Sequence, residues 1–359
     1  MAATISVHDQ LGLRSSTTRR PSTRSQTQSQ IQVQSQNQSQ AQTQFQKSNL
    51  NSNPRVASSS PARLAAAAPQ SPVAAYEAFI TAYPTPSAMS QAYDLHRRRR
   101  NLDQRARIVA AAAINPDPIL SGLVLDHQPP EFDPRNCISL WARPPSNIRN
   151  LVANIQRQLL LVEPDLWCMP QDCLHMTALE VIHSSSSAHV ASALSLLTPI
   201  LESLLAPYPA PSLVRPILSY DQNALALSFL PSDDISSAHS SWYSYHHLRR
   251  DLARICARAG VPAESRYIYP SAHVTIARFV KPLSCSIEDW LYSIDSINSW
   301  LDSSYSLDSS WTVATERGLE CRCGRIWYGG GYAQATGPSL TQSDLSLSSS
   351  SLDRSTLLD

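Results

Sequence analysis

The chain has 359 residues, with 29 basic side chains, 28 acidic side chains and a net charge of +1. This length allows a sizeable buried core, no apolar run is long enough to cross a bilayer, and the N-terminus lacks the apolar core of a secretory signal. The near-neutral charge does not decide between a nucleic-acid partner and a small phosphorylated one, because charge can be concentrated locally.

Both ends of the chain have the composition of disordered tails. Residues 1–75 are dominated by Ser, Gln, Thr, Asn and Ala, and residues 332–359 are rich in Ser and Leu. Neither segment can bury enough apolar surface to offset its chain entropy. Before Glu77 the only acidic residue is Asp9, against seven basic residues. This bias fits a basic disordered tail, which we favour, or a mitochondrial presequence.

Residues 76–133 are predicted to form a helical extension and a linker. The segment contains the run His96-Arg97-Arg98-Arg99-Arg100. Such a run is typical of a solvated helix face, the interpretation that we favour, and also of a nuclear-import or RNA-phosphate patch.

A compact domain is predicted over residues 134–331, where apolar residues recur with helical and strand spacing. The predicted helices cover 148–159, 190–204, 245–255 and 287–301. The predicted strands cover 137–142, 174–182, 213–220, 224–230, 272–280, 310–315 and 324–328. Because the order of helix, histidine-bearing strand, helix and further strands occurs twice, we expect an α+β domain with an internal pseudo-repeat.

The seven cysteines are scattered and odd in number, which favours reduced thiols in an intracellular protein over a disulfide framework. Cys321 and Cys323 resemble half of a metal site, but no second pair with suitable spacing accompanies them. We therefore expect no metal and no other cofactor. The cytoplasm is the favoured compartment, with the nucleus and the mitochondrion left open.

Two short strings repeat one pattern of histidine, apolar residue and threonine. They are His175-Met176-Thr177 and His273-Val274-Thr275, each inside an apolar run that predicts a buried strand. Residues two apart on a strand lie on the same face, so each string directs an imidazole and a hydroxyl to one side. A single such string is most often structural, whereas a matched pair favours function.

A pair of histidines can supply a general base and a general acid, and the threonine hydroxyls can donate hydrogen bonds to anionic oxygens. Hydrolysis of a phosphodiester needs both kinds of group. We expect His175 and His273 to face each other across a common groove, with Thr177 and Thr275 beside a bound phosphate.

The paired strings resemble the signature of the 2H phosphoesterase superfamily. His273-Val274-Thr275-Ile276-Ala277-Arg278 is especially similar to the second motif of its RNA-ligase-like and cyclic-phosphodiesterase branches, and the string from His175 is a looser match. The resemblance covers about residues 134–331. It implies an α+β fold of two duplicated lobes around a central antiparallel sheet groove. It also implies metal-independent cleavage of 2′,3′-cyclic or RNA-end phosphodiesters, with RNA-ligase-like activity open.

Further residues are weaker candidates for substrate contacts. Tyr267 and Tyr269 precede the second string and can stack on a base or belong to the core. Arg278 can neutralise phosphate, although strand alternation places it opposite His273 unless the strand bulges or ends. Three other histidines are predicted to lie on the surface, at positions 239, 246 and 247, and His183 is given no role.

Two other functions stay open at this point. One is a non-catalytic nucleotide- or RNA-binding module that uses its disordered tail to recruit partners. The other is metal-dependent hydrolysis, for which Glu180 is the one acidic residue close to a motif. In each case the expected partner is a nucleotide or an RNA with a cyclic or terminal phosphodiester, and we expect a monomer without a membrane partner.

Overall fold

The computed structural model describes residues 71–206, 208–234, 242–265, 269–304 and 310–339. These residues belong to one of the two compact units of the chain, Ala65–Asp359. The predicted N-terminal tail up to residue 70, His239 and Tyr267 lie outside the described residues.

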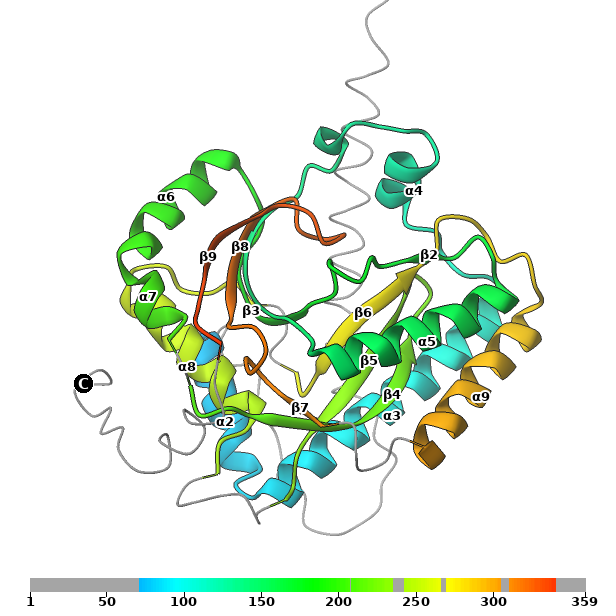
Figure 1. Cartoon of the computed structure of the whole chain (residues 1–359), viewed down its shortest axis with the longest axis horizontal. Helices are drawn as coiled ribbons and strands as arrows, with labels where there is room; N and C mark the ends of the chain where they lie inside the picture. Colours follow the sequence, from blue (N-terminus) through cyan, green and yellow to red (C-terminus); the bar gives the residue numbers. More distant parts are fainter. Residues whose placement is uncertain (1–70, 207, 235–241, 266–268, 305–309, 340–359) are drawn as a thin grey trace, which may run out of the picture. The chain divides into compact units, whose positions relative to one another are not determined.

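A nine-stranded antiparallel sheet organises the described part of the chain (Figure 1). The strands follow the order β7-β4-β5-β6-β3-β1-β8-β9, and β2 pairs with the end of β6. Their bounds are β1 Asn136–Ala142, β2 Trp167–Cys168, β3 Met176–Ser185, β4 Ser212–Tyr220, β5 Ala224–Pro231, β6 Ala272–Arg278, β7 Trp311–Thr312, β8 Glu320–Gly324 and β9 Tyr332–Thr336.

Helices cover the sheet on both of its halves. Their bounds are α2 Pro72–Ala82, α3 Pro86–Ala111, α4 Pro118–Val124, α5 Ser146–Val162, α6 Ser187–Leu197, α7 Leu201–Leu204, α8 Tyr245–Arg258 and α9 Ile287–Ser304, with 3₁₀ turns η1 Pro130–Phe132 and η2 Thr198–Ile200. Figure 1 shows α5 and α9 beside β4, β5 and β6, and α6, α7 and α8 on the side of β3 and β8. The fold is therefore a mixed helix-and-sheet fold with a curled antiparallel sheet.

The main helices follow the apolar periodicity of the sequence. In α5, five residues at helical spacing are almost completely buried, namely Ile148, Leu151, Val152, Ile155 and Leu159. The hairpin between β4 and β5 turns where it was predicted, because the Asp221 carboxylate accepts hydrogen bonds from the backbone N–H groups of Asn223 and Ala224.

Several boundaries differ from the predictions. The last predicted strand, 324–328, is wrong: β8 ends at Gly324, whose φ of 99° is favourable only for glycine. A further strand, β9, lies within the predicted C-terminal tail and pairs with β8. At the other end, α2 begins within the predicted N-terminal tail, because Pro72 starts the helix and the Ser71 hydroxyl caps it.

The helices α2 and α3 pack against the remainder of the unit. Tyr76, Met89 and Tyr93 are fully buried in its main core. Within the arginine run, Arg97 is buried and donates to the carbonyls of β4 and β5, whereas Arg98 is exposed. The run is thus partly a solvated helix face and partly a packing surface, and the domain boundary at residue 134 stays a prediction.

Candidate active site

The two His-x-Thr strings lie on neighbouring strands of the sheet. Strands β3 and β6 are antiparallel and pair through Met176 and Val274. An antiparallel pair centred on these two residues places His175 beside Thr275 and His273 beside Thr177. The strings therefore adjoin each other within one sheet, instead of forming the opposite walls of a groove.

Burial follows the expected alternation along both strings. The histidines and threonines are all partly buried, whereas the residues between and beside them are buried: Leu174, Met176, Ala178, Ala272, Val274 and Ile276. Because residues two apart share a face, the four polar side chains lie on the side of the sheet opposite these apolar residues.

Both motif strands bulge directly after the threonine. In β3, Thr177 pairs with Trp141 and Leu179 pairs with Leu140, so the residue between Thr177 and Leu179 is unpaired. In β6 the same shift occurs between Thr275 and Ala277. A bulge moves the later residues to the other face. Arg278 therefore shares the face of His273, which simple alternation does not allow.

His175 has a defined hydrogen bond and a defined ring contact. Its Nδ1 lies 2.8 Å from the carbonyl oxygen of Cys173, and its ring stacks on Trp141 with centroids 3.5 Å apart. Because a carbonyl only accepts, Nδ1 carries the proton and Nε2 of the neutral ring is an acceptor. Burial, with Arg143 and Arg322 nearby, lowers the pKa of His175 to about 3.

A buried ion pair supports the segment before His175. Arg143 bonds both oxygens of Glu320, at 3.0 and 2.9 Å, and donates to the carbonyls of Asp172 and Leu174. Arg322 also lies 3.7 Å from the Glu320 carboxylate. This bidentate arrangement fixes the loop that positions His175.

His273 lies in cationic surroundings. Its Nδ1 is 2.9 Å from the Ser271 hydroxyl. Burial lowers its pKa to about 4, with further lowering by Arg100, Arg249 and Arg278 and an opposing effect of Asp221. Both motif histidines are therefore neutral at pH 7 in the free protein.

Arg278 lies on the motif face and has few firm partners among the described residues. Its Nη1 is 3.4 Å from Asp117, and its Nε is buried without a hydrogen-bond partner in the structure. The rings of Trp327 and Tyr328 lie 5.8 and 5.5 Å from its guanidinium carbon. Sequence analysis missed both aromatic residues, because their segment was predicted as a strand and not as part of the site.

The remaining predicted residues have mixed outcomes. Tyr269 is partly exposed and stacks on His96, with centroids 5.9 Å apart. The surface position predicted for His246 is wrong: this residue is fully buried, and its Nδ1 lies 2.7 Å from the Tyr93 hydroxyl. His247 is partly buried. His183 pairs with Glu180 at 2.9 Å, further along β3.

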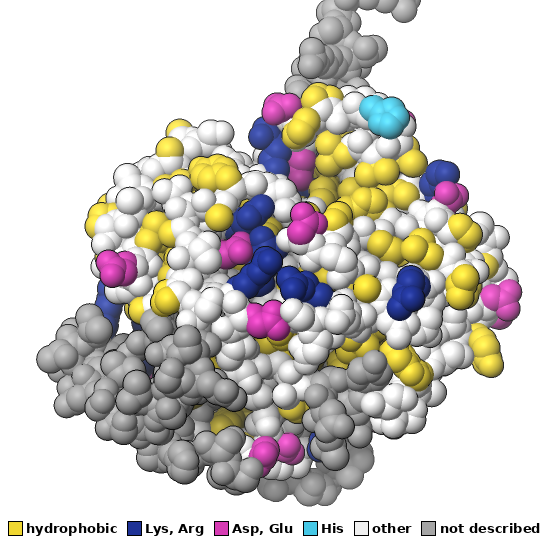
Figure 2. Space-filling view, in the orientation of Figure 1, with side chains coloured by type: hydrophobic (Ala, Val, Ile, Leu, Met, Phe, Trp, Pro, Cys, Tyr) yellow, Lys and Arg dark blue, Asp and Glu magenta, His cyan; other side chains and the backbone are white. Residues whose placement is uncertain are grey.

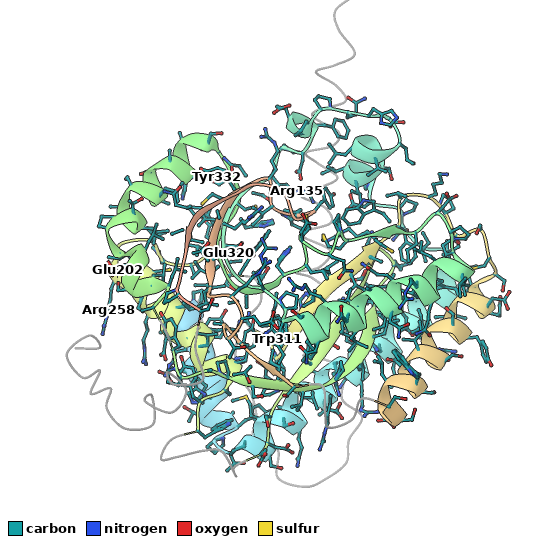
Figure 3. The ribbon with its side chains drawn as sticks, viewed as in Figure 1. Arg135, Glu202, Arg258, Trp311, Glu320 and Tyr332 are labelled. Carbon is teal, nitrogen blue, oxygen red and sulfur yellow. The ribbon has the colours of Figure 1, made fainter. Side chains whose placement is uncertain are left out.

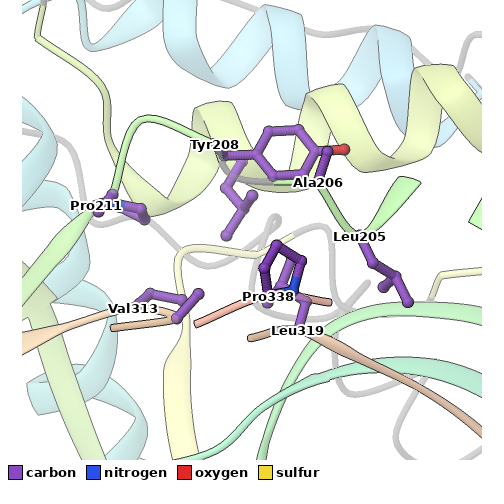
Figure 4. Close-up of a pocket in the computed structure, with 10 residues that line it drawn as sticks. Leu205, Ala206, Tyr208, Pro211, Val313, Leu319 and Pro338 are labelled. Atoms are coloured by element: carbon purple, nitrogen blue, oxygen red, sulfur yellow. The ribbon is translucent and has the colours of Figure 1, made fainter. Parts of the chain in front are cut away.

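The wider surroundings of the motifs are rich in arginine. Figure 2 shows Lys and Arg side chains gathered near the middle of one face, with acidic side chains around them. Arg135 and Glu320, which belong to buried ion pairs, are labelled in Figure 3. An apolar pocket lined by Leu205, Tyr208, Val313 and Leu319 contains no motif residue (Figure 4).

Within the described ranges, no group of His, Cys, Asp and Glu side chains has the arrangement of a metal site. Among the helices in these ranges, none combines the length and the apolar character that crossing a membrane requires.

Comparison with known proteins gives only distant structural similarities. No protein family and no curated protein matches the chain. A conserved protein of unknown function from Agrobacterium tumefaciens is similar with a TM-score of 0.36 and 10% identity, over 53% of this chain and 81% of that chain. E. coli LigT complexed with 3′-AMP is similar with a TM-score of 0.31 and 14% identity, over 57% of this chain and 95% of that chain. LigT complexed with ATP gives a TM-score of 0.31 and 14% identity, over 58% and 99%. We therefore base the function on the chain's own residues.

Proposed function

We propose that this protein is a metal-independent phosphodiesterase of the 2H phosphoesterase type, acting on 2′,3′-cyclic or RNA-end phosphodiesters. The observation that supports the proposal most is the antiparallel pairing of the two motifs, which brings two imidazoles and two hydroxyls together on one face. The matching bulges after Thr177 and Thr275 also support the proposal that the two halves are duplicated lobes.

The tautomer of His175 suggests how the roles divide. With Nδ1–H bonded to the Cys173 carbonyl, Nε2 of His175 can accept a proton from an attacking water. The water oxygen forms a bond to phosphorus while the bond between phosphorus and the leaving ribose oxygen breaks, and protonated His273 donates a proton to that leaving oxygen. Thr177, Thr275 and Arg278 can donate hydrogen bonds to the non-bridging phosphate oxygens as charge develops.

The test is turnover by the full chain of 2′,3′-cyclic nucleotides and short RNAs in EDTA. We expect hydrolysis that His175→Ala or His273→Ala reduces by at least about 10²-fold, since each proton-transfer group contributes about 10² to 10⁴ in rate. His189→Ala is the matched control, because His189 is exposed and outside the motifs. Product analysis by phosphate position identifies the bond that is cleaved.

Other outcomes of this assay contradict the proposal in distinct ways. Nucleotide binding without hydrolysis supports the non-catalytic binding module instead. Activity that is lost in EDTA and restored by a divalent ion supports metal-dependent hydrolysis. Joining of RNA ends, in place of cleavage, shows ligation as the main reaction.

A further inference from the structure

The two motif strands, β3 and β6, share little backbone pairing. Strands β1 and β3 pair along six positions, and so do β5 and β6, whereas β3 and β6 pair only through Met176 and Val274. One backbone pair constrains the relative position of two strands weakly. The distance between the motif histidines therefore depends on contacts outside the β3–β6 ladder.

Helix α8 makes such contacts with the first motif strand and with the segment that leads into the second. The Tyr245 hydroxyl donates a hydrogen bond of 2.9 Å to the carbonyl of Thr177, within the first motif. Arg249 donates a hydrogen bond of 3.0 Å to the carbonyl of Tyr269, three residues before β6 begins. Since Tyr245 and Arg249 are four residues apart, they lie on the same face of α8.

Arg249 is an unusual residue for this position. It is 0% exposed, and no carboxylate pairs with it in the part of the chain that the structure describes. Its guanidinium carbon lies 4.9 Å from the ring centre of Tyr76 and 5.7 Å from that of Tyr245, and its Nε and Nη2 have no hydrogen-bond partner. A buried cation without an anionic partner is costly for stability, so apolar packing alone does not explain it.

His273 is within the electrostatic reach of this buried cation. The charged groups that act on His273 come from several elements: Arg100 from α3, Arg249 from α8, Arg278 from β6 and Asp221 from the β4–β5 turn, with His175 on the neighbouring strand. Of these cations, Arg100 pairs with Asp221 and Arg278 faces Asp117. Arg249 is the member of this set without a carboxylate partner among the described residues.

We propose that Tyr245 and Arg249 are positioning residues for the acid–base pair. Helix α8 holds the first motif through the carbonyl of Thr177 and the segment leading into β6 through the carbonyl of Tyr269, where Arg249 also places a buried positive charge four residues before His273. This inference rests on the proposed function for its catalytic meaning. The ring of Tyr76 of α2 lies against the same guanidinium, so α2, which precedes the predicted domain, takes part in the arrangement.

The first test measures the effect of the Arg249 charge on His273 in the full chain. Arg249→Met removes the charge, and we expect the pKa of His273, followed by NMR of labelled histidines, to rise above about 4 while burial and Arg100 keep it below its ordinary value. Arg249→Lys keeps the charge and should leave this pKa low. Arg258→Met, on the exposed last turn of α8, is the control and should leave the pKa of His273 unchanged.

The second test uses Tyr245→Phe, which removes the hydroxyl and keeps the ring. We expect kcat to fall about tenfold, because the bond to the Thr177 carbonyl is lost, while the pKa of His273 stays unchanged. A merely structural tyrosine would lower the melting temperature without this loss of kcat in the folded protein. Tyr292→Phe, on the exposed face of α9, is the matched control.

Two results overturn the inference. One is an unchanged His273 pKa in a folded Arg249→Met protein, and the other is an unchanged kcat in Tyr245→Phe. If Arg249→Met fails to fold, Tyr245→Phe still tests the inference through kcat at constant His273 pKa. The NMR titration needs no turnover, so absence of activity in the unmodified chain contradicts the proposed function without hiding the electrostatic result.

Discussion

The motif histidines combine low basicity with a geometry suited to proton transfer. In the free protein their pKa values are about 3 and about 4, so both rings lose their protons well below pH 7. The proposed reaction needs one neutral and one protonated ring. Such a singly protonated pair is therefore a minority species at neutral pH until an anion binds and favours the imidazolium.

A pH profile should show this effect with a defined sign. Above pH 5 the protonated fraction of a group with a pKa of about 4 falls tenfold per pH unit, so kcat/KM should fall with that slope up to pH 8. In the complex the phosphate raises the pKa of the acid, so kcat should stay constant to a higher pH. Steady-state kinetics at constant ionic strength measure kcat and kcat/KM at each pH. A kcat/KM that is independent of pH between 5 and 8 contradicts this assignment.

Arg278 should contribute to transition-state binding through its position on the motif face. Because its hydrogen bond to Asp117 is long and leaves its charge available to a phosphate, Arg278→Met should lower kcat/KM by about 10- to 100-fold, the loss expected for a hydrogen bond to a charged group. Arg98→Met, at an exposed position on α3, should leave kcat/KM unchanged. Equal values of kcat/KM for the two variants would remove Arg278 from the site.

At the scale of whole elements, sequence periodicity was informative where elements are long. The helix α5 and the strand β1 were predicted within a few residues, because α5 buries residues at helical spacing and β1 buries a continuous run. The bulges in β3 and β6 were not predicted, since a bulge changes the face of a residue without changing the composition. The two-residue strand β2 and the edge strand β9 are too short or too exposed to produce an alternating pattern.

The β8–β9 connection gives a prediction at this scale. Gly331 has a φ of 68°, and a Cβ added there would lie 2.2 Å from the carbonyl oxygen of Cys323. Gly331→Ala should therefore lower the free energy of unfolding by about 1–3 kcal/mol, from backbone strain and a steric clash. Urea unfolding measures the loss. Ala333→Ser, at an exposed position in β9, should change stability by less than about 0.5 kcal/mol.

On the scale of the whole molecule, the site depends on segments far apart in the chain. Tyr76 from α2 contacts Arg249 of α8, and Tyr93 from α3 contacts His246 of α8. Helix α8 in turn bonds Thr177 of the first motif and Tyr269 in the segment before β6. Sequence analysis identified the motifs because their chemistry is local. It could not predict these supporting contacts, because Tyr76 and Arg249 are 173 residues apart and each is individually unremarkable.

A comparison of fragments tests this dependence directly. The fragment 134–331 contains both motifs, but it removes Tyr76 and Tyr93 and cuts the β8–β9 pair. Without those aromatic rings, the buried guanidinium of Arg249 and the ring of His246 become exposed to water, and α8 loses the helices packed against it. We therefore expect 134–331 to unfold at lower temperature and to lose turnover of 2′,3′-cyclic nucleotides. The fragment 71–339 should retain the cooperative unfolding and the kcat of the full chain. Full turnover by 134–331 would show that α2 and α3 are dispensable, because the motif strands would then hold their register without the packing on α8.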